Sequence, residues 1–166
     1  FYNTGEVTVN IPALYIQKKL GLMDRWHQEP YKIENIKNYV ASTDPNKTID
    51  EPSENNDTGL WIRLGMFDQL ARGFGDNFYP NLNQEVRYLR QSGQINPQTD
   101  EEKKQLFMVV ASKVSNRNLT EFFTKWGMYP TQETLEAIEH YPDLNQPIWN
   151  NIVEPDVVEN ELPSYS

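Results

Sequence analysis

The clearest helix pattern in the chain begins at Leu60. Its apolar positions recur every three or four residues, which places them on one face of a helix. Asp57 or Thr58 can cap the start of this helix, and Gly75 can adopt the backbone conformation that often ends one. The apolar positions are Leu60, Leu64, Phe67, Ala71 and Phe74.

Two more amphipathic helices are predicted after this one. The first begins near Phe78 and ends near Gly93. The second opens on the sequence TDEE, in which Thr99 and Glu102 have the spacing of a capping box, an arrangement that satisfies two free N–H groups at a helix start. The predicted inward residues are Phe78, Leu82, Val86 and Leu89 in the first helix, and Leu106, Val109, Val110 and Val114 in the second.

Three further helices have weaker signals. One follows the sequence SNRN, with Asn118 as its predicted N-cap and Gly127 as its end. Another is capped by Thr131, and the third lies earlier in the chain, after Pro30. Their predicted inward residues are Leu119, Phe122, Phe123 and Trp126, then Leu135 and Ile138, and lastly Ile33, Ile36 and Val40.

Two segments depart from the helical pattern. Residues Ser42–Thr58 are polar and acidic and contain proline, which predicts a mobile surface loop; loops of this length are usually functional or disordered. Residues Pro142–Ser166 contain four prolines and several acids, which predicts an extended tail or a linker to a further domain. Trp149, Ile152 and the pair Val157–Val158 can pack back on the helices.

These patterns together predict a mainly α fold. We expect a compact, helical bundle-like subdomain of about six or seven helices, with one long acidic loop and an extended C-terminal tail. No stretch alternates strictly between apolar and polar residues, so few strands are expected. We assign residues 1–141 to the helical subdomain and residues 142–166 to the tail or linker.

Composition supports a folded domain and narrows its functions. The chain has 166 residues, of which 37% are hydrophobic and 12% aromatic, enough to build a core. Its formal net charge of −9 makes nucleic acid an improbable partner, because phosphate contacts need clustered Lys and Arg. No cysteine is present, so a disulfide or a cysteine-based zinc site is not possible. No apolar run approaches the ~20 residues of a membrane span.

Glu6 stands ahead of an apolar run near the start of the chain and is the main candidate for chemistry. If this segment is helical, Glu6 and Asn10 lie one turn apart on the same face. The helix dipole alone favours a carboxylate at a helix start, which is a purely structural explanation. Alternatively, Glu6 is a metal ligand and Asn10 orients it. Pro12 complicates both interpretations, because it can kink the helix or delay its start until after Asn10.

Other side chains offer weaker candidates. His27 and His140 each lack a partner at metal-ligand spacing, and the sequence has no H-E-x-x-H, phosphate-binding loop or G-x-S-x-G motif. The chain therefore contains no complete catalytic centre of these kinds. Trp61, Tyr79 and Tyr88 have the spacing of core residues, but they can instead lie at the rim of a cleft that binds sugar or peptide.

Three segments resemble one family. The sequence GEVTVNIPALYIQKKLG resembles the stretch just after the zinc-binding helix of the enhancin-like zinc metallopeptidases, which include viral enhancins and bacterial mucin-degrading enzymes. The sequence LGMFDQLARGFGDNFYPNLNQEVRYL is similar to a later helix pair of that family, and SKVSNRNLTEFFTKWGMYPTQETLEAI is similar to its closing segment. The resemblance covers most of the chain from Gly5 to Ile138, in the same order. It departs from the family pattern at Asp76 and at Pro12.

The resemblance implies a zinc site that is shared with an earlier part of the protein. In the family, zinc is bound by the two histidines of an H-E-x-x-H helix and by a glutamate a short distance downstream. Glu6 matches that glutamate and Asn10 matches an asparagine that follows it, while the histidine helix would end before Phe1. The chain is then the C-terminal part of the peptidase domain, with the N-terminal remainder of that domain as its partner.

The resemblance also implies a biological setting. It predicts a secreted or cell-surface protein of bacterial or viral origin that hydrolyses peptide bonds in glycoproteins such as mucins. A single glutamate cannot hold zinc alone, so the isolated fragment should be inactive. The sequence does not identify the donor to the transition state; Tyr15, His27 and Tyr79 are candidates only by the chemistry of their side chains. Two alternatives stay open: a non-enzymatic helical module that binds glycans or host glycoproteins, and a helical domain without a site.

Overall fold

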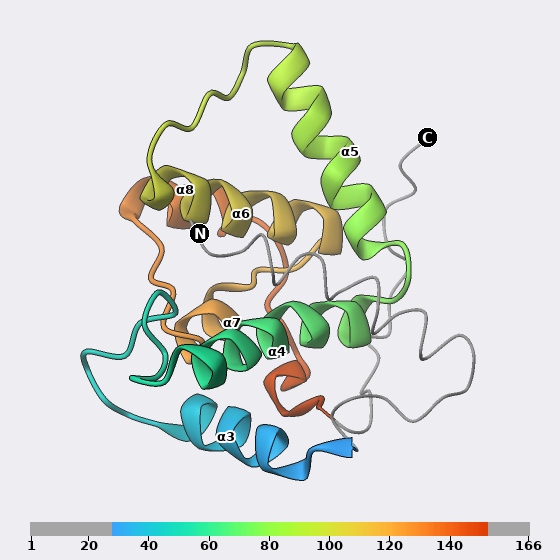
Figure 1. Cartoon of the computed structure of the whole chain (residues 1–166). Coiled ribbons are helices and arrows are strands. Elements are labelled where there is room, and N and C mark those ends of the chain that lie inside the picture. The colour runs from blue at the N-terminus through green and yellow to red at the C-terminus, as the bar shows by residue number, and fades with distance from the viewer. Residues whose placement is uncertain (1–27, 153–166) are drawn as a thin grey trace.

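The structure is a computed structural model that describes residues 28–152 (Figure 1). Within this range the chain forms six α-helices and one short 3-10 helix, η1, and no strand, which confirms the predicted mainly α fold. A single β-bridge joins Asn118 and Asp143. The elements are α3 (Pro30–Ala41), α4 (Asn56–Phe74), α5 (Phe78–Gln91), α6 (Asp100–Ser115), α7 (Thr120–Lys125), α8 (Gln132–Ile138) and η1 (Ile148–Asn150).

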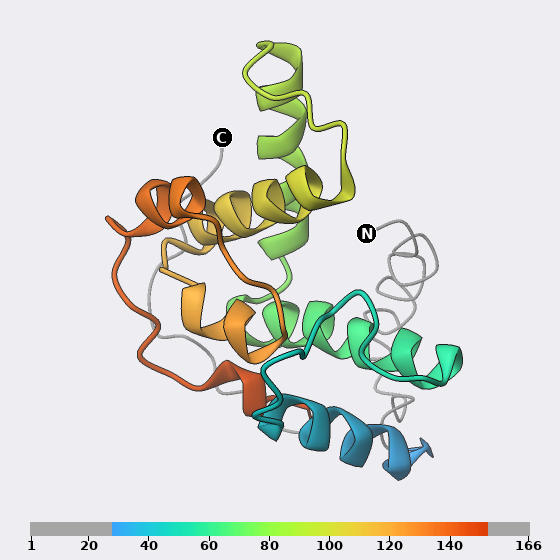
Figure 2. The same cartoon turned by 90° about the vertical axis from the view of Figure 1, so that its left-hand side faces the viewer.

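Helix α4 holds the elements together. Helices α3 and α5 and the short η1 all pack against it, while α6 packs against α5 and α8 (Figure 1). Seen from the side, α8 lies alongside α6, and the far end of α5 stands out from the body (Figure 2). Within residues 28–152, no helix combines the length and the apolar character that a membrane crossing requires.

The helix ends agree with most of the predicted capping residues. The capping box of α6 is present: the N–H of Glu102 donates to the Thr99 hydroxyl at 3.1 Å, and the Glu102 carboxylate accepts from the N–H of Thr99 at 2.9 Å. Thr131 caps α8. Gly75 and Gly127 follow α4 and α7 with φ of 86° and 72°, a region that glycine adopts without the penalty of a side chain.

Two predicted caps are wrong. Helix α4 is capped by Asn55 and not by Asp57 or Thr58, because the Asn55 side chain accepts a hydrogen bond from the N–H of Thr58 at 2.9 Å. Helix α7 begins at Thr120, with Leu119 at the cap position. The predicted cap, Asn118, lies one residue earlier, where its side-chain oxygen still accepts from the N–H of Thr120 at 3.1 Å.

The core collects the apolar faces of every helix. The predicted residues Leu119, Phe122, Phe123 and Trp126 are all fully buried. In α6 the prediction is partly wrong: Val110 and Val114 are buried as predicted, but Leu106 and Val109 are only half-buried, while Phe107 and Met108 face the core instead. The apolar positions of α6 therefore extend beyond its buried face: Leu106 packs against the edge of the core, and Val109 is half-buried beside it.

A buried glutamine joins three parts of this core. The side chain of Gln69 in α4 is fully buried. Its oxygen accepts from the Trp126 indole N–H at 3.0 Å, and its amide donates to the Trp149 carbonyl at 2.6 Å. Because an unpaired buried amide is costly, both bonds hold α4, the end of α7 and η1 in fixed register.

The first part of the predicted tail packs on the helices. Leu144, Ile148 and Ile152 are buried, and Trp149 is half-buried. The predicted docking of Trp149 and Ile152 is thus confirmed, whereas Val157–Val158 lie outside the described residues. The division of the chain at residue 142 stays a prediction, and residues 142–152 contribute side chains to the same core as the helices.

Gly127 provides a test of how tightly this core is closed. A methyl group added there would lie 2.8 Å from the Tyr39 hydroxyl and 3.0 Å from the Lys47 carbonyl oxygen. Gly93 has the same φ of 72° but no atom within 4 Å of the added carbon. Gly127→Ala should therefore lower the free energy of unfolding by about 1–2 kcal/mol for backbone strain plus roughly 1–3 kcal/mol for overpacking.

Gly93→Ala is the matched control, because it adds the backbone strain without the close contacts. Urea unfolding of both variants measures the difference. Equal losses of stability would show that the contacts around Gly127 are not tight.

Candidate functional site

The predicted zinc ligand and its partner, Glu6 and Asn10, lie outside the described residues, as do Tyr15 and His27. Their roles stay predictions. In residues 28–152, no three His, Cys, Asp or Glu side chains gather closely enough to hold a metal ion. His140 is exposed and lies against the ring of Tyr141, with the ring centroids 4.0 Å apart. The described helices therefore do not build a metal centre by themselves.

The Tyr79 hydroxyl makes a structural contact. Its hydroxyl donates to the Phe67 carbonyl at 2.5 Å, which ties the start of α5 to α4. Burial raises the pKa of the Tyr79 hydroxyl well above its usual value, and the nearby Asp68 carboxylate raises it further. The role of Tyr79 as a transition-state donor stays a prediction.

The other two candidate aromatics have different environments. The Lys32 ammonium lies 3.3 Å from the centroid of the Trp61 ring, a cation–π contact that joins α3 to α4. Lys32 is itself buried and forms an ion pair with Glu29. Tyr88 is 59% exposed on α5. Trp61 thus supports the packing of two helices, and Tyr88 presents its ring to solvent.

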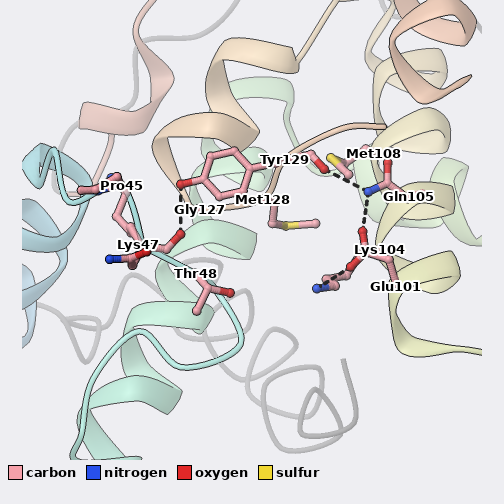
Figure 3. Close-up of a pocket in the computed structure, with 11 residues that line it drawn as sticks. Pro45, Lys47, Thr48, Glu101, Lys104, Gln105, Met108, Gly127, Met128 and Tyr129 are labelled. Carbon is pink, nitrogen blue, oxygen red and sulfur yellow. Dashed lines mark hydrogen bonds and ion pairs between the residues drawn. The ribbon is translucent and has the colours of Figure 1, made fainter. Parts of the chain in front are cut away.

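A polar pocket of about 300 Å³ lies between the long loop and α6 (Figure 3). Loop residues around Lys47 form one wall, the first turns of α6 form the opposite wall, and the segment after α7 connects them. We call this cavity the polar pocket. It is lined by Pro45, Asn46, Lys47, Thr48, Glu101, Lys104, Gln105, Met108, Gly127, Met128 and Tyr129.

The long loop is fixed to the helices at several points. It runs from residue 42 to residue 55, as the loop prediction broadly requires. Ile49 is buried, and its N–H donates to the Gly127 carbonyl at 3.3 Å. The Tyr129 hydroxyl donates to the Lys47 carbonyl at 2.9 Å, and Asp50 forms an ion pair with Lys104 at 2.6 Å. These contacts give the pocket a defined loop wall.

Lys47 also closes the end of α3. Its ammonium donates to the Ser42 carbonyl at 2.8 Å and to the carbonyls of Tyr39 and Val40 at 3.3 Å each. A cation is stabilised there because the last carbonyls of a helix carry partial negative charge. Burial nevertheless lowers the pKa of Lys47, and the Lys125 charge lowers it further. The ammonium of Lys47 therefore points toward the end of α3 and fixes the loop to that helix.

The charged groups on the α6 wall neutralise one another. Hydrogen bonds from Lys104 and Gln105 lower the pKa of Glu101. Burial opposes the charge of Lys104, but hydrogen bonds to Asp50 and Glu101 outweigh it and raise the pKa of Lys104. Gln105 donates to Glu101 at 2.6 Å and to the Tyr129 carbonyl at 3.0 Å, so it bridges both sides of the pocket (Figure 3).

The polar pocket presents groups that are suited to binding a ligand. The lowered pKa of Glu101 and the raised pKa of Lys104 keep both groups charged near neutral pH, away from the pKa near 7 that suits a proton transfer. No histidine, serine or cysteine is among the residues that line the pocket. The arrangement offers hydrogen-bond donors, acceptors and two methionines to a small polar ligand.

Comparison with known proteins identifies the family. The chain belongs to the Peptidase M60, enhancin and enhancin-like family, whose sequence model matches residues 1–127. The resemblance found in the sequence is thereby confirmed, and the chain is related to metallopeptidases. The matched region includes Glu6 and Asn10. No match was found among curated proteins.

Two crystal structures are similar to this chain over nearly its whole length. One is of a functionally unknown conserved protein from Bacillus anthracis str. Ames, with 35% identity and a TM-score of 0.77 over 97% of this chain. The other is of a mutant of a functionally unknown conserved protein from the same strain, with 36% identity and a TM-score of 0.81 over 98% of this chain. This chain spans about a third, 32%, of the length of each.

The capping box of α6 predicts a pH dependence of stability. Hydrogen bonds from the N–H groups of Thr99 and Gln98 lower the pKa of Glu102 below its usual 4.5. Because the pKa is lower in the folded state, ionised Glu102 stabilises the fold above about pH 4.5, and this stabilisation is lost as the pH falls through the folded-state pKa. Glu102→Gln should lower the melting temperature at pH 7 and make less difference at pH 3.5 to 4.

Glu34, an exposed residue of α3, provides the control: Glu34→Gln should alter the melting temperature little at either pH. Thermal unfolding followed by circular dichroism measures all three proteins. A Glu102→Gln deficit of the same size at both pH values would contradict the assigned role of the carboxylate.

Proposed function

We propose that this chain is the C-terminal helical part of a zinc metallopeptidase domain that hydrolyses peptide bonds in glycoproteins such as mucins. The family match over residues 1–127 is the observation that carries this proposal. The chain spans about a third of the length of the two similar crystal structures, which is consistent with a domain that is completed by other parts of a longer protein.

Glu6 is the proposed third zinc ligand. A catalytic zinc is typically held by three protein ligands, and two histidines with one glutamate are an established set. The chain offers a carboxylate at the matching position, and the two histidines would come from a preceding segment of the parent protein. Asn10 would hydrogen-bond the Glu6 carboxylate and fix its orientation, as outer-shell partners of metal ligands do. Zinc, when bound, acts as a Lewis acid that polarises the carbonyl group of the substrate.

The described helices have a supporting role in this proposal. Helix α4, with its buried Gln69, would provide a rigid scaffold behind the zinc site and one wall of the substrate cleft. The exposed rings of Tyr88 and Tyr129, at 59% and 49% exposure, are suited to contacts with sugar or peptide groups. Because mucins are extracellular, we also propose that the protein is secreted or lies at the cell surface.

A non-enzymatic binding module is the second candidate function. It is favoured by the polar pocket, which offers hydrogen-bond donors and acceptors to a polar ligand. In this case the 166-residue chain alone would bind a glycan or a host glycoprotein. Binding of mucin glycans by the chain without its parent would favour this alternative, provided that the parent shows no peptidase activity.

The zinc-ligand assignment is tested in the full-length parent protein. Glu6→Ala should remove most of the bound zinc, measured by elemental analysis, and most hydrolysis of a mucin or casein substrate. Asn10→Ala should weaken zinc binding about 10- to 100-fold, because it removes an outer-shell partner and leaves the ligand. Glu34→Ala, which removes an exposed carboxylate on α3, is the matched control and should retain both zinc and activity.

Two results would contradict the assignment. Full zinc occupancy and hydrolysis in Glu6→Ala would show that another residue is the ligand. A zinc-free parent that still binds glycans would leave only the binding-module function.

A further inference from the structure

A second cavity, of about 580 Å³, adjoins the polar pocket along α6, and both cavities are lined by Glu101 and Gln105. It is formed by α6, by α8 and by residues 95–97 of the segment that returns from α5 to α6; Figure 2 shows α8 beside α6 at this place. We call it the apolar groove. Its lining residues are Ile95, Asn96, Pro97, Glu101, Glu102, Gln105, Leu106, Val109, Thr131, Glu133, Thr134 and Ala137.

The floor of the groove is apolar and partly open to solvent. Leu106 and Val109 lie three residues apart on α6 and so share one face, and both are half-buried. Ala137 of α8 is exposed beside them, and Ile95 and Pro97 are half-buried in the returning segment. The neighbouring face of α6, with Phe107 and Val110, is buried in the core, and Leu106 packs against the edge of that core. The floor of the groove is therefore an apolar strip beside the buried face of α6, which the core covers only in part.

The rim of the groove is negatively charged. Three glutamates line it, Glu101 and Glu102 from α6 and Glu133 from α8, and no Lys or Arg is among its lining residues. Glu101 is partly neutralised by Lys104, whose ammonium lies 2.9 Å from its carboxylate. Glu102 accepts from the neutral N–H groups of Gln98 and Thr99, and these bonds leave its negative charge in place. Glu133 is exposed in the first turn of α8.

We propose that the apolar groove docks a short segment of a partner protein that combines apolar side chains with Lys or Arg. The apolar side chains would cover Leu106 and Val109, and the cations would lie against Glu102 and Glu133. This is the helix- or strand-in-groove mode of recognition, in which a few apolar anchors give affinity and flanking charges give orientation.

The negative charge of the chain and of the groove rim disfavours two other ligands, a second copy of this chain and an acidic peptide. A second copy of this chain is disfavoured because both copies carry a formal charge of −9 and would repel one another. An acidic peptide would place like charges at the rim, which costs binding energy. The proposal concerns a binding surface and does not depend on the zinc site, so it stands or falls separately from the proposed peptidase function.

The test uses the full chain and an array of short synthetic peptides of about 12 residues, long enough to present one amphipathic face. Every peptide contains Leu, Ile or Phe, and the remaining positions are filled with Lys and Arg in one set, Glu in a second and Ser in a third. Binding should be confined to the Lys and Arg set. The dissociation constant of the tightest peptide is then measured by fluorescence anisotropy, and it should rise when salt is increased from ~50 to ~500 mM.

Variants locate the binding site. Ala137→Trp should fill the groove and weaken binding by about tenfold or more. Glu133→Lys should weaken it roughly three- to tenfold, because a favourable charge pair is replaced by repulsion. Glu136→Lys makes the same change on an exposed residue of α8 that does not line the groove, and it should alter binding by about twofold at most. Circular dichroism checks that each variant is folded.

Val109→Thr is a second floor variant in case Ala137→Trp disturbs the fold, because it keeps the volume and removes apolar character; it should weaken binding severalfold. The proposal is overturned if the Glu or Ser peptides bind as well as the Lys and Arg peptides. It is also overturned if binding is unaffected by changes at residues 109, 133 and 137. Dimerisation that Ala137→Trp abolishes, seen by sedimentation, would assign the groove to a second copy and overturn it as well.

Discussion

The buried side chain of Gln69 is the interaction on which the arrangement of the helices depends. One amide satisfies an indole N–H after α7 and a carbonyl in η1, while the helix that carries it contacts α3 and α5. Apolar packing alone tolerates sliding of one helix over another, whereas two short hydrogen bonds in a dry core fix the register. The aromatic rings of Trp126 and Phe122 pack beside the elements that Gln69 joins.

The sequence predicted the positions of the helices well, but it predicted their capping residues and buried faces less well. Helical periodicity located all six described helices, and the capping box at Thr99 was found because two side chains three residues apart are a local signal. The cap at Asn55 was missed because several polar residues near the start of α4 have equal propensity to cap, and only the backbone conformation selects one. The inward face of α6 was only partly located, because apolar residues cover much of this helix and periodicity does not rank Leu106 and Val109 below Phe107 and Met108.

The polar pocket could not be predicted, because its walls are far apart in the sequence. Lys47 and Tyr129 meet through one hydrogen bond across 82 residues, and Asp50 reaches Lys104 across 54 residues. Ile49, a lone apolar residue in a polar loop, was the one available signal that the loop is anchored. For the zinc site the situation is reversed: Glu6 was proposed from its match to a family, and the described residues neither include it nor supply a metal cluster. Family membership rests on the sequence match, and the described fold adds the scaffold.

The order in which Gln69 acquires its partners has a consequence for synthesis on the ribosome. The groups that satisfy this side chain come 57 and 80 residues later in the chain. When α4 has left the ribosome but η1 has not yet been made, the Gln69 side chain lacks one of its hydrogen-bond partners. The early helices therefore pack without a fixed register at this stage. The last described turn of the chain thus completes the hydrogen bonding of the core. A stop codon shortly before residue 149 would release a protein that keeps most of its helices but has lost much of its stability.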